Sequence, residues 1–242
     1  FLQIRRPPTS TRFPYPTLFR SAVWLDDAPV ATEQKDYPHQ PGWWWSFGSR
    51  PGVTEDGVPY FVGGITDALG GATDLRGLFY GHDAAPVIMG GQLLPGLPLP
   101  LSATASPSFD YRYSAYGSHF ICLVDMEGST ATDAGMVMDG AGLLIAGQLV
   151  QEGMPVPAAA GGLPGENWAA FDYCGVTESG RYMFTGDTSA AIAVDEFVLV
   201  DGQIVLREGA VLSGNTVSGA IESAYMNDDG DWAVIWDVTT PT

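Results

Sequence analysis

Short apolar runs alternate with turn-forming residues along most of the chain, and these runs favour strands. The clearest example is residues 196–200, which are followed by Asp201-Gly202 and by a second run at residues 203–207. Asp-Gly between two apolar runs predicts a β-hairpin, because both turn positions need a positive φ. Similar arrangements surround Gly90-Gly91 and Ala146-Gly147, and the three Gly-Gln pairs at these turns lie 56 and 55 residues apart.

A second pattern places a turn ahead of an aromatic or β-branched run. The turn begins with Asn, Ser or Thr, has Gly three residues later, and occurs at residues 54–57, 114–117, 177–180 and 227–230. The first side chain can accept a hydrogen bond from the backbone, and the glycine supplies a left-handed conformation. The residues that follow each turn favour a strand.

The two patterns alternate with a period near 55 residues, which is typical of propeller blades built from about four short strands. We therefore predict an all-β fold of repeated antiparallel, blade-like sheets in a partial β-propeller, with about four units. The alternative is an antiparallel meander in which glycine marks every turn. The expected core residues are Phe61, Ile88, Phe120, Ile145, Phe184, Val198, Ile204 and Val234.

Residues 1–21 differ from the rest of the chain. They carry four arginines and no acidic residue, and they resemble the translation of a sequencing adapter, FLxIRRPPxSTxFPYxTLFRS. A transit peptide is the alternative, but Pro7-Pro8, Pro14 and Pro16 oppose the amphipathic helix that such peptides form. We expect residues 1–21 to be an adapter-derived artefact outside the fold, and residues 22–242 to form one β-repeat domain that is truncated at one or both ends.

The last turn and its strand, residues 227–234, have the sequence NDDGDWAV. This resembles the N-x-x-G-x-x-A-F repeat of a bacterial choice-of-anchor tandem-repeat family: Asn227, Gly230 and Ala233 match, and Val234 stands where the family has Phe. The other three turns keep the glycine but begin with Thr or Ser. The resemblance extends loosely over residues 50–238. It implies a propeller-like, exported protein with a C-terminal anchor and brings no established activity.

The charge excludes one class of function. The chain has 28 acidic and 10 basic residues, a net charge of −18 and a pI of about 4.1. Nucleic-acid binding needs a basic surface, so we predict no nucleic-acid partner. Four of the bases lie in residues 1–21, which leaves 28 acidic and 6 basic residues in the remainder. Such acidity suits saline or extracellular surroundings, and no apolar run is long enough to predict a membrane-spanning helix.

Candidate catalytic residues are few. The histidines are His39, His82 and His119; no two have metal-ligand spacing, and no G-x-S-x-G motif occurs. Residues 227–231 resemble part of a calcium loop, but the spacing is one residue short and the distal glutamate is missing. We interpret them as a solvated turn, and we predict no catalytic residue, metal ligand or cofactor.

Two further groups leave alternatives open. Trp43, Trp44 and Trp45 point to both faces of a strand, so an exposed ring for sugar stacking and packing inside a sheet are both compatible with the sequence. Cys122 and Cys174 could form a disulfide across neighbouring sheets or remain as two buried free thiols. The chain contains no C-x-x-C motif.

The sequence thus predicts an exported, non-enzymatic interaction module that is secreted or at the cell surface, with an unknown carbohydrate or protein ligand. The alternative is a propeller-type polysaccharide hydrolase or lyase. Such an enzyme would place two carboxylates, or a histidine and a carboxylate, about 5–10 Å apart in a central pocket.

Overall fold

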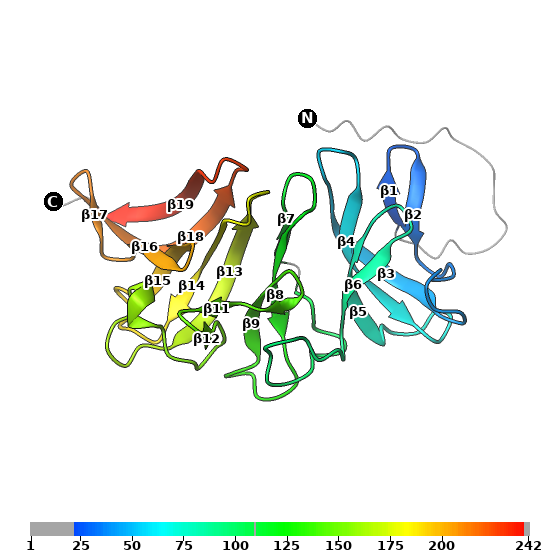
Figure 1. Ribbon diagram of the computed structural model, residues 1–242, viewed down its shortest axis with the longest axis horizontal. Helices are drawn as coiled ribbons and strands as arrows, with labels where there is room; N and C mark the ends of the chain where they lie inside the picture. Colours follow the sequence, from blue (N-terminus) through cyan, green and yellow to red (C-terminus); the bar gives the residue numbers. More distant parts are fainter. Residues whose placement is uncertain (1–21, 109, 240–242) are drawn as a thin grey trace.

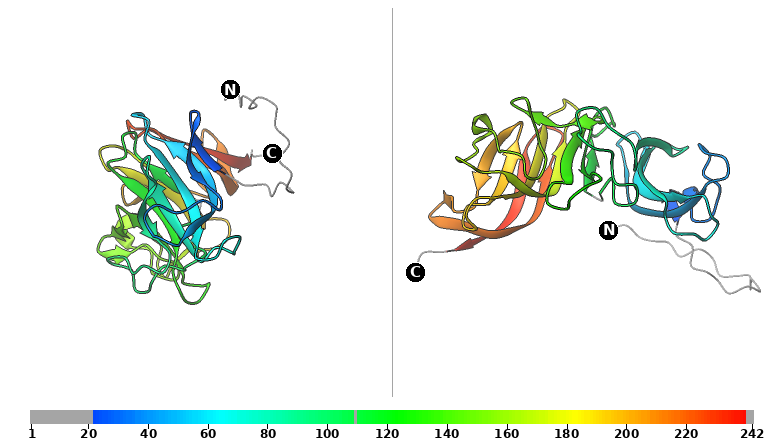
Figure 2. Two further views of the ribbon diagram at one scale, coloured as in Figure 1. Left: turned by 90° about the vertical axis from the view of Figure 1, so that its right-hand side faces the viewer. Right: turned by 90° about the horizontal axis from the view of Figure 1, so that it is seen from below.

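The protein is built from antiparallel β-sheets that follow one another along the molecule (Figures 1 and 2). The computed structural model describes residues 22–108 and 110–239, so the predicted adapter-derived segment, residues 1–21, lies outside the described residues. Within the described ranges the sole helical element is a single 3-10 turn, η1, at Ala158–Ala160. The predicted all-β class is confirmed.

Three sheets have four strands in sequence order, and a fourth sheet has three. Sheet 1 contains β3 (Trp44–Val53), β4 (Pro59–Thr66), β5 (Leu75–Tyr80) and β6 (Ala85–Met89). Sheet 2 contains β7 (Tyr111–Tyr113), β8 (Phe120–Asp125), β9 (Ala134–Met138) and β10 (Ala141–Gly142). Sheet 3 contains β13 (Trp168–Val176), β14 (Tyr182–Thr188), β15 (Glu196–Val200) and β16 (Gln203–Arg207), and sheet 4 contains β17 (Val211–Leu212), β18 (Asn215–Met226) and β19 (Trp232–Thr239).

Two hairpins complete the described structure: β1 (Ala22–Leu25) with β2 (Ala28–Thr32), and β11 (Leu144–Ile145) with β12 (Gln148–Leu149). The described sheets form an open row and do not close into a ring (Figure 1).

The predicted turn ahead of each aromatic strand is present in all four sheets, where it joins β3 to β4, β7 to β8, β13 to β14 and β18 to β19. In each turn the glycine N–H donates to the carbonyl of the first turn residue at 3.0 Å. The glycines have φ between 79° and 84°, a conformation that other residues adopt only with strain. The first side chain accepts a backbone N–H, as predicted, at 2.9 Å for Thr54, 3.1 Å for Ser114, 3.0 Å for Thr177 and 2.8 Å for Asn227.

The predicted equivalence of the three Gly-Gln pairs is wrong. Asp201-Gly202 joins β15 to β16 inside sheet 3. Ala146-Gly147 instead joins β11 to β12, which lie outside the four-stranded sheets, and Gly90-Gly91 is not directly followed by a strand. The turn that matches Asp201-Gly202 is Asp139-Gly140 of sheet 2. Glycine serves any turn that needs a positive φ, so a recurring dipeptide does not establish equivalent positions.

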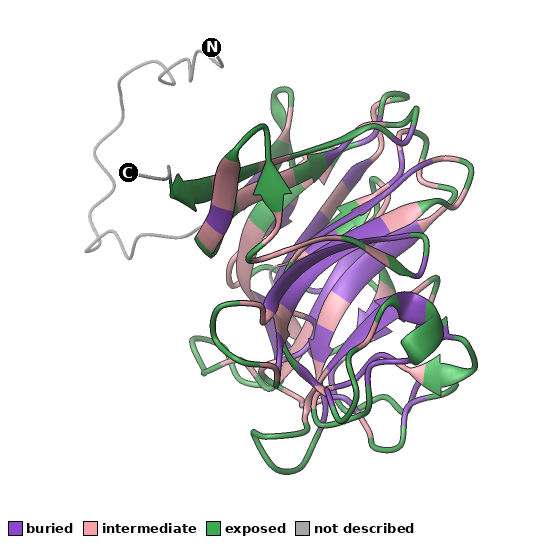
Figure 3. Ribbon diagram, turned by 90° about the vertical axis from the view of Figure 1, so that its left-hand side faces the viewer, coloured by how far each residue is buried: buried purple, intermediate pink, exposed green. Residues whose placement is uncertain are grey.

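Four hydrophobic cores fill the spaces between successive layers, from the β1–β2 hairpin to sheet 4. Most of the expected core residues are buried, and Ile204 and Val234 are half-buried. Figure 3 shows buried residues concentrated on the middle strands, whereas β19 is mostly exposed. Every sheet therefore depends on its neighbour for half of its core.

The β1–β2 hairpin takes the place of a sheet ahead of sheet 1. Its turn residue Asp26 has φ 52°, close to the 51° of Asp139 and the 48° of Asp201 at the turns between third and fourth strands. Residues 28–30 of β2 and residues 85–87 of β6 are both Ala-Pro-Val. The hairpin therefore corresponds to the outer two strands of a sheet.

Candidate binding pocket

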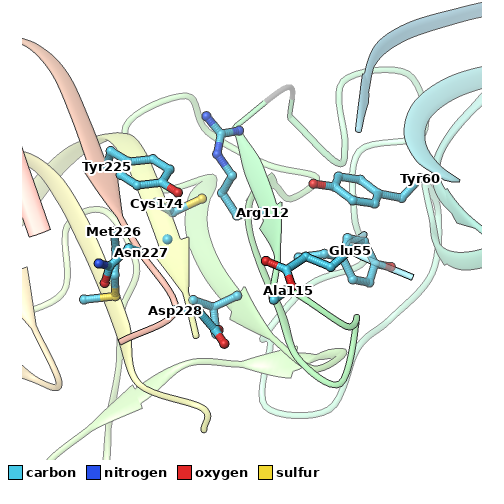
Figure 4. Close-up of a pocket in the computed structure, with 12 residues that line it drawn as sticks. Glu55, Tyr60, Arg112, Ala115, Cys174, Tyr225, Met226, Asn227 and Asp228 are labelled. Atoms are coloured by element: carbon cyan, nitrogen blue, oxygen red, sulfur yellow. The ribbon is translucent and has the colours of Figure 1, made fainter. Parts of the chain in front are cut away.

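A pocket of about 430 Å³ lies among the turn ends of the sheets. Residues from all four sheets contribute to it. In Figure 4 these residues lie on both sides of the opening. The lining residues are Glu55, Tyr60, Arg112, Tyr113, Ala115, Cys174, Gly175, Val176, Tyr225, Met226, Asn227 and Asp228. The volume lies within the range of about 300–1,000 Å³ that is usual for small-ligand sites.

Hydrogen bonds between successive turns bring these residues together. The Asp228 carboxylate of sheet 4 accepts the Glu178 N–H of sheet 3 at 2.6 Å. The Glu178 carboxylate in turn accepts the Tyr116 N–H of sheet 2 at 3.0 Å, and the Glu55 N–H of sheet 1 donates to the Ala115 carbonyl at 2.7 Å. We call this chain of contacts the turn ladder. It aligns the four turns, so residues more than a hundred positions apart face the same space.

The glycines of three turns also lie close to the preceding sheet, whereas a Cβ on Gly57 would meet nothing within 4 Å. A Cβ on Gly117 would collide with the Tyr80 ring, and a Cβ on Gly230 would collide with the Arg181 guanidinium. A Cβ on Gly180 would lie 3.3 Å from His119 Nε2. Glycine is thus required both for the left-handed turn and for the close approach of the sheets.

Arg112 is the basic residue of the pocket. Its Nη1 donates to the Tyr111 carbonyl at 2.7 Å, and no carboxylate of the described residues lies within ion-pair distance of it. Arg181 and Arg207, by contrast, pair with Asp201 and Glu166 at 2.8 and 2.5 Å. Most of the Arg112 donors therefore remain open to a bound molecule.

Three tyrosines, Tyr60, Tyr113 and Tyr225, line the pocket together with Arg112. Figure 4 shows Arg112 between Tyr225 of β18 and Tyr60 of β4, and Tyr225 is 65% exposed. Burial raises the pKa of Tyr60, although Arg112 acts in the opposite direction, and burial also raises the pKa of Tyr113. The buried Tyr113 hydroxyl has no hydrogen-bond partner among the described residues. The phenols of Tyr60 and Tyr113 therefore stay protonated at neutral pH.

The histidines singled out by the sequence lie apart from this pocket. His39 Nε2 lies 2.8 Å from the Asp83 carbonyl oxygen, and His82 is exposed. His119 Nδ1 lies 2.7 Å from Asp139 Oδ2, beside a second hollow of about 370 Å³ that Asp139 lines. Distance alone would make this pair a candidate for acid–base chemistry.

The next sheet assigns a structural role to that pair. In sheet 3, Arg181 Nε donates to Asp201 Oδ2 at 2.8 Å, and the other oxygen accepts the Tyr182 N–H at 3.0 Å. In sheet 2 the other Asp139 oxygen likewise accepts the Phe120 N–H, at 2.9 Å. Asp139 and Asp201 thus occupy corresponding turns, and each is held by a different basic residue. His119 in sheet 2 therefore has the same structural role as Arg181 in sheet 3, which is to hold the turn aspartate.

The remaining sequence candidates do not form a site. Trp45 is buried against Tyr37 and Phe79, and Trp43 and Trp44 are half-buried. This arrangement is packing rather than a sugar platform. In the turn at residues 227–231, one Asp228 oxygen belongs to the turn ladder. The part of the chain that the structure describes contains no group of three or more His, Cys, Asp or Glu residues that could hold a metal.

Cys122 and Cys174 are buried free thiols in different cores. Burial raises the pKa of Cys174 to about 12, so this thiol is protonated at neutral pH although it lines the pocket. Within the described ranges, no helix is long and apolar enough to cross a membrane. Comparison with family models, with curated proteins and with solved structures finds no match for this chain.

Sequence reasoning missed Arg112, Tyr60 and Tyr225. One signal was available: Arg112 is one of only six basic residues in 22–242 and stands between two tyrosines. Its significance depends on no carboxylate of the described residues lying within ion-pair distance of it, which a single sequence does not reveal.

Proposed function

We propose that the protein is an exported, non-enzymatic interaction module that binds an extracellular ligand in the pocket around Arg112. The observation that carries the proposal is this arginine without an ion-pair partner among the described residues, in a chain with 28 acidic residues. Arg112 is exposed, so its open donors are accessible to acceptors on a bound molecule. A ligand that supplies them would be strongly favoured.

The finer description of the fold belongs to the same proposal. Four-stranded sheets in sequence order, stacked with cores between them, are what successive propeller blades look like. The turn pattern that resembles the choice-of-anchor repeat family recurs in all four sheets. These features support a partial propeller of about four units and, through the resemblance, export to the cell surface or the medium.

The alternative is a polysaccharide hydrolase or lyase, and one observation favours it. Arginine beside tyrosine can neutralise a sugar carboxylate and remove a proton in a lyase reaction. A tyrosine base, however, needs a pKa lowered towards neutrality, and the pKa values of Tyr60 and Tyr113 are raised. Tyr60 and Tyr113 are therefore poorly suited to act as the base of a lyase.

Affinity electrophoresis of the full chain through gels that contain neutral or acidic polysaccharides tests this proposal. The same mixtures are assayed for new reducing ends and for the ultraviolet absorbance of unsaturated products. We expect retention without product, and we expect Arg112→Gln to abolish retention. Product formation that Arg112→Gln removes would establish the enzyme, and retention that is unaffected by Arg112→Gln would overturn the assigned pocket.

Export has its own test. An antibody against the chain should label intact source cells or detect the protein in their medium. Detection only after cell lysis would contradict export.

A further inference from the structure

We propose that the pocket takes a uronic-acid oligosaccharide, with one sugar carboxylate on Arg112 and sugar faces against Tyr60 and Tyr225. This inference rests on the proposed binding function and names the class of ligand. It combines three observations: the charge balance of the pocket, its aromatic walls, and its remaining hydrogen-bonding groups.

The charge balance favours a monoanion. The pocket lining has one cation, Arg112, and two acidic residues, Glu55 and Asp228. A planar carboxylate can accept two parallel hydrogen bonds from one guanidinium. A dianionic phosphate would gain the same partner but would face repulsion from both acidic side chains. One sugar carboxylate therefore suits the one open guanidinium, and the other carboxylates of an oligomer would have to lie away from Glu55 and Asp228.

The aromatic walls favour a sugar ring. Tyr60 and Tyr225 lie on opposite sides of Arg112 in Figure 4 and come from sheets 1 and 4. Tyrosine combines an apolar ring face with a polar hydroxyl. The C–H face of a pyranose can pack on the ring while its hydroxyl groups bond to polar neighbours. Both tyrosines line the same pocket, so one oligomer can contact both.

One remaining polar group, Asp228, suits a hydroxyl partner. The Tyr113 hydroxyl is buried without a hydrogen-bond partner among the described residues, so it does not serve as a contact for the ligand. Asp228 Oδ1 is committed to the Glu178 N–H, and its second oxygen can accept from a sugar hydroxyl. This exchange supplies a partner to a group that would otherwise lose its hydration.

Isothermal titration of the full chain with oligogalacturonate of defined length tests the inference. The comparison ligand is the methyl-esterified oligomer of the same length, which keeps the rings and removes the charges. We expect the acidic oligomer to bind at least tenfold more tightly, and Arg112→Gln to reduce its affinity about tenfold to hundredfold. Lys35→Gln, which removes one positive charge outside the pocket lining, should change the affinity less than twofold.

The tyrosines have a matched pair of variants. Tyr225→Ala should weaken binding several-fold, whereas Tyr225→Phe should retain most of it, because the ring face remains. An unchanged Tm for each variant shows that the fold is intact.

The outcomes separate the two proposals. Equal binding of esterified and acidic oligomers, or tighter binding of a sulfated oligomer, would overturn the uronate while leaving a binding module. If the acidic oligomer is bound and cleaved, the uronate ligand is supported and the proposed non-enzymatic function is overturned. If no oligomer binds although the gels retain the protein, the uronate is overturned.

Discussion

Glu196 is a buried acidic residue whose ionisation affects the stability of the fold. It is buried at the start of β15, and Oε1 accepts the Ile221 N–H of β18 at 2.5 Å. Burial raises its pKa to about 7, with repulsion from Asp187, Asp172 and Glu208 adding to the effect and the backbone hydrogen bond opposing it. The folded protein therefore holds the proton more tightly than the unfolded chain does.

The sign of the pH effect follows from this raised pKa. The stabilising contribution of protonated Glu196 is complete below its ordinary pKa of 4.5 and is lost as pH rises through about 7. Glu196→Gln keeps an acceptor for Ile221 and removes the charge, so we expect it to stabilise the protein by about 1–3 kcal/mol at pH 8 and by little at pH 4. Urea unfolding at both values measures this. The exposed Glu222→Gln serves as the control, and an equal gain at both pH values would contradict the assignment.

A second residue-scale prediction concerns the buried ion pair between Glu166 and Arg207. Burial alone would raise the pKa of Glu166, but hydrogen bonds from Arg207, from the Leu163 N–H and from Thr188 outweigh it and leave this pKa below its ordinary value. The Glu166 side chain is only 1% exposed. Glu166→Ala leaves a half-buried guanidinium unpaired, so we expect a loss of about 3–5 kcal/mol.

The exposed pair of Arg50 with Asp110, at 3.0 Å, provides the comparison. Asp110→Ala should cost less than about 1 kcal/mol, because solvent screens exposed charges. Urea unfolding measures the loss of unfolding free energy for Glu166→Ala and for Asp110→Ala. Similar losses would show that burial does not determine the contribution of the Glu166–Arg207 pair.

At the scale of elements, the turns explain why much of the fold could be predicted. The first residue and the glycine of each turn fix its hydrogen bonds locally, so four residues of sequence suffice. The equivalence of the Gly-Gln turns was predicted wrongly because a turn sequence acts locally. It does not show which sheet the flanking strands join. The pocket could not be predicted, because Glu55, Arg112 and Tyr225 meet only when the turns of separate sheets align.

The turn glycines give a direct test of this account. Gly180 has φ 79° and lies against His119. We expect Gly180→Ala to destabilise the protein by about 1–2 kcal/mol, because the left-handed conformation strains a residue with a Cβ. Gly180→Asn should cost less, since asparagine adopts this conformation more readily. Thermal unfolding compares the variants, and equal losses would show that space beside His119, rather than φ, decides the cost.

At the scale of the whole molecule, sheet 4 contrasts with the sheets before it. The second strands β4 and β14 are mostly buried, but β19 pairs only with β18 among the described strands and exposes Ile235 to 60%. An exposed apolar edge strand is a template for pairing with other chains. Sheet 4 is therefore the part of the described structure most exposed to self-association.

A charge on this edge should reduce that tendency. We expect Ile235→Lys to lower the aggregated fraction measured by light scattering at high protein concentration, while Tm changes little. Ile192→Lys adds the same charge at another exposed position, residue 192, outside the strands. If the two variants improve solubility equally, net charge and not the strand edge is responsible.

The turn ladder has a consequence for how such a molecule can evolve. Its contacts between sheets 2 and 3 and between sheets 3 and 4 have the same form: a carboxylate in the later turn receives an N–H of the turn before it. These two junctions therefore share one form of contact, whereas the junction between sheets 1 and 2 uses the Glu55 N–H and the Ala115 carbonyl. Unequal recombination that duplicated or deleted sheet 3 would recreate a junction of this form. The number of sheets could therefore change without a new kind of interface.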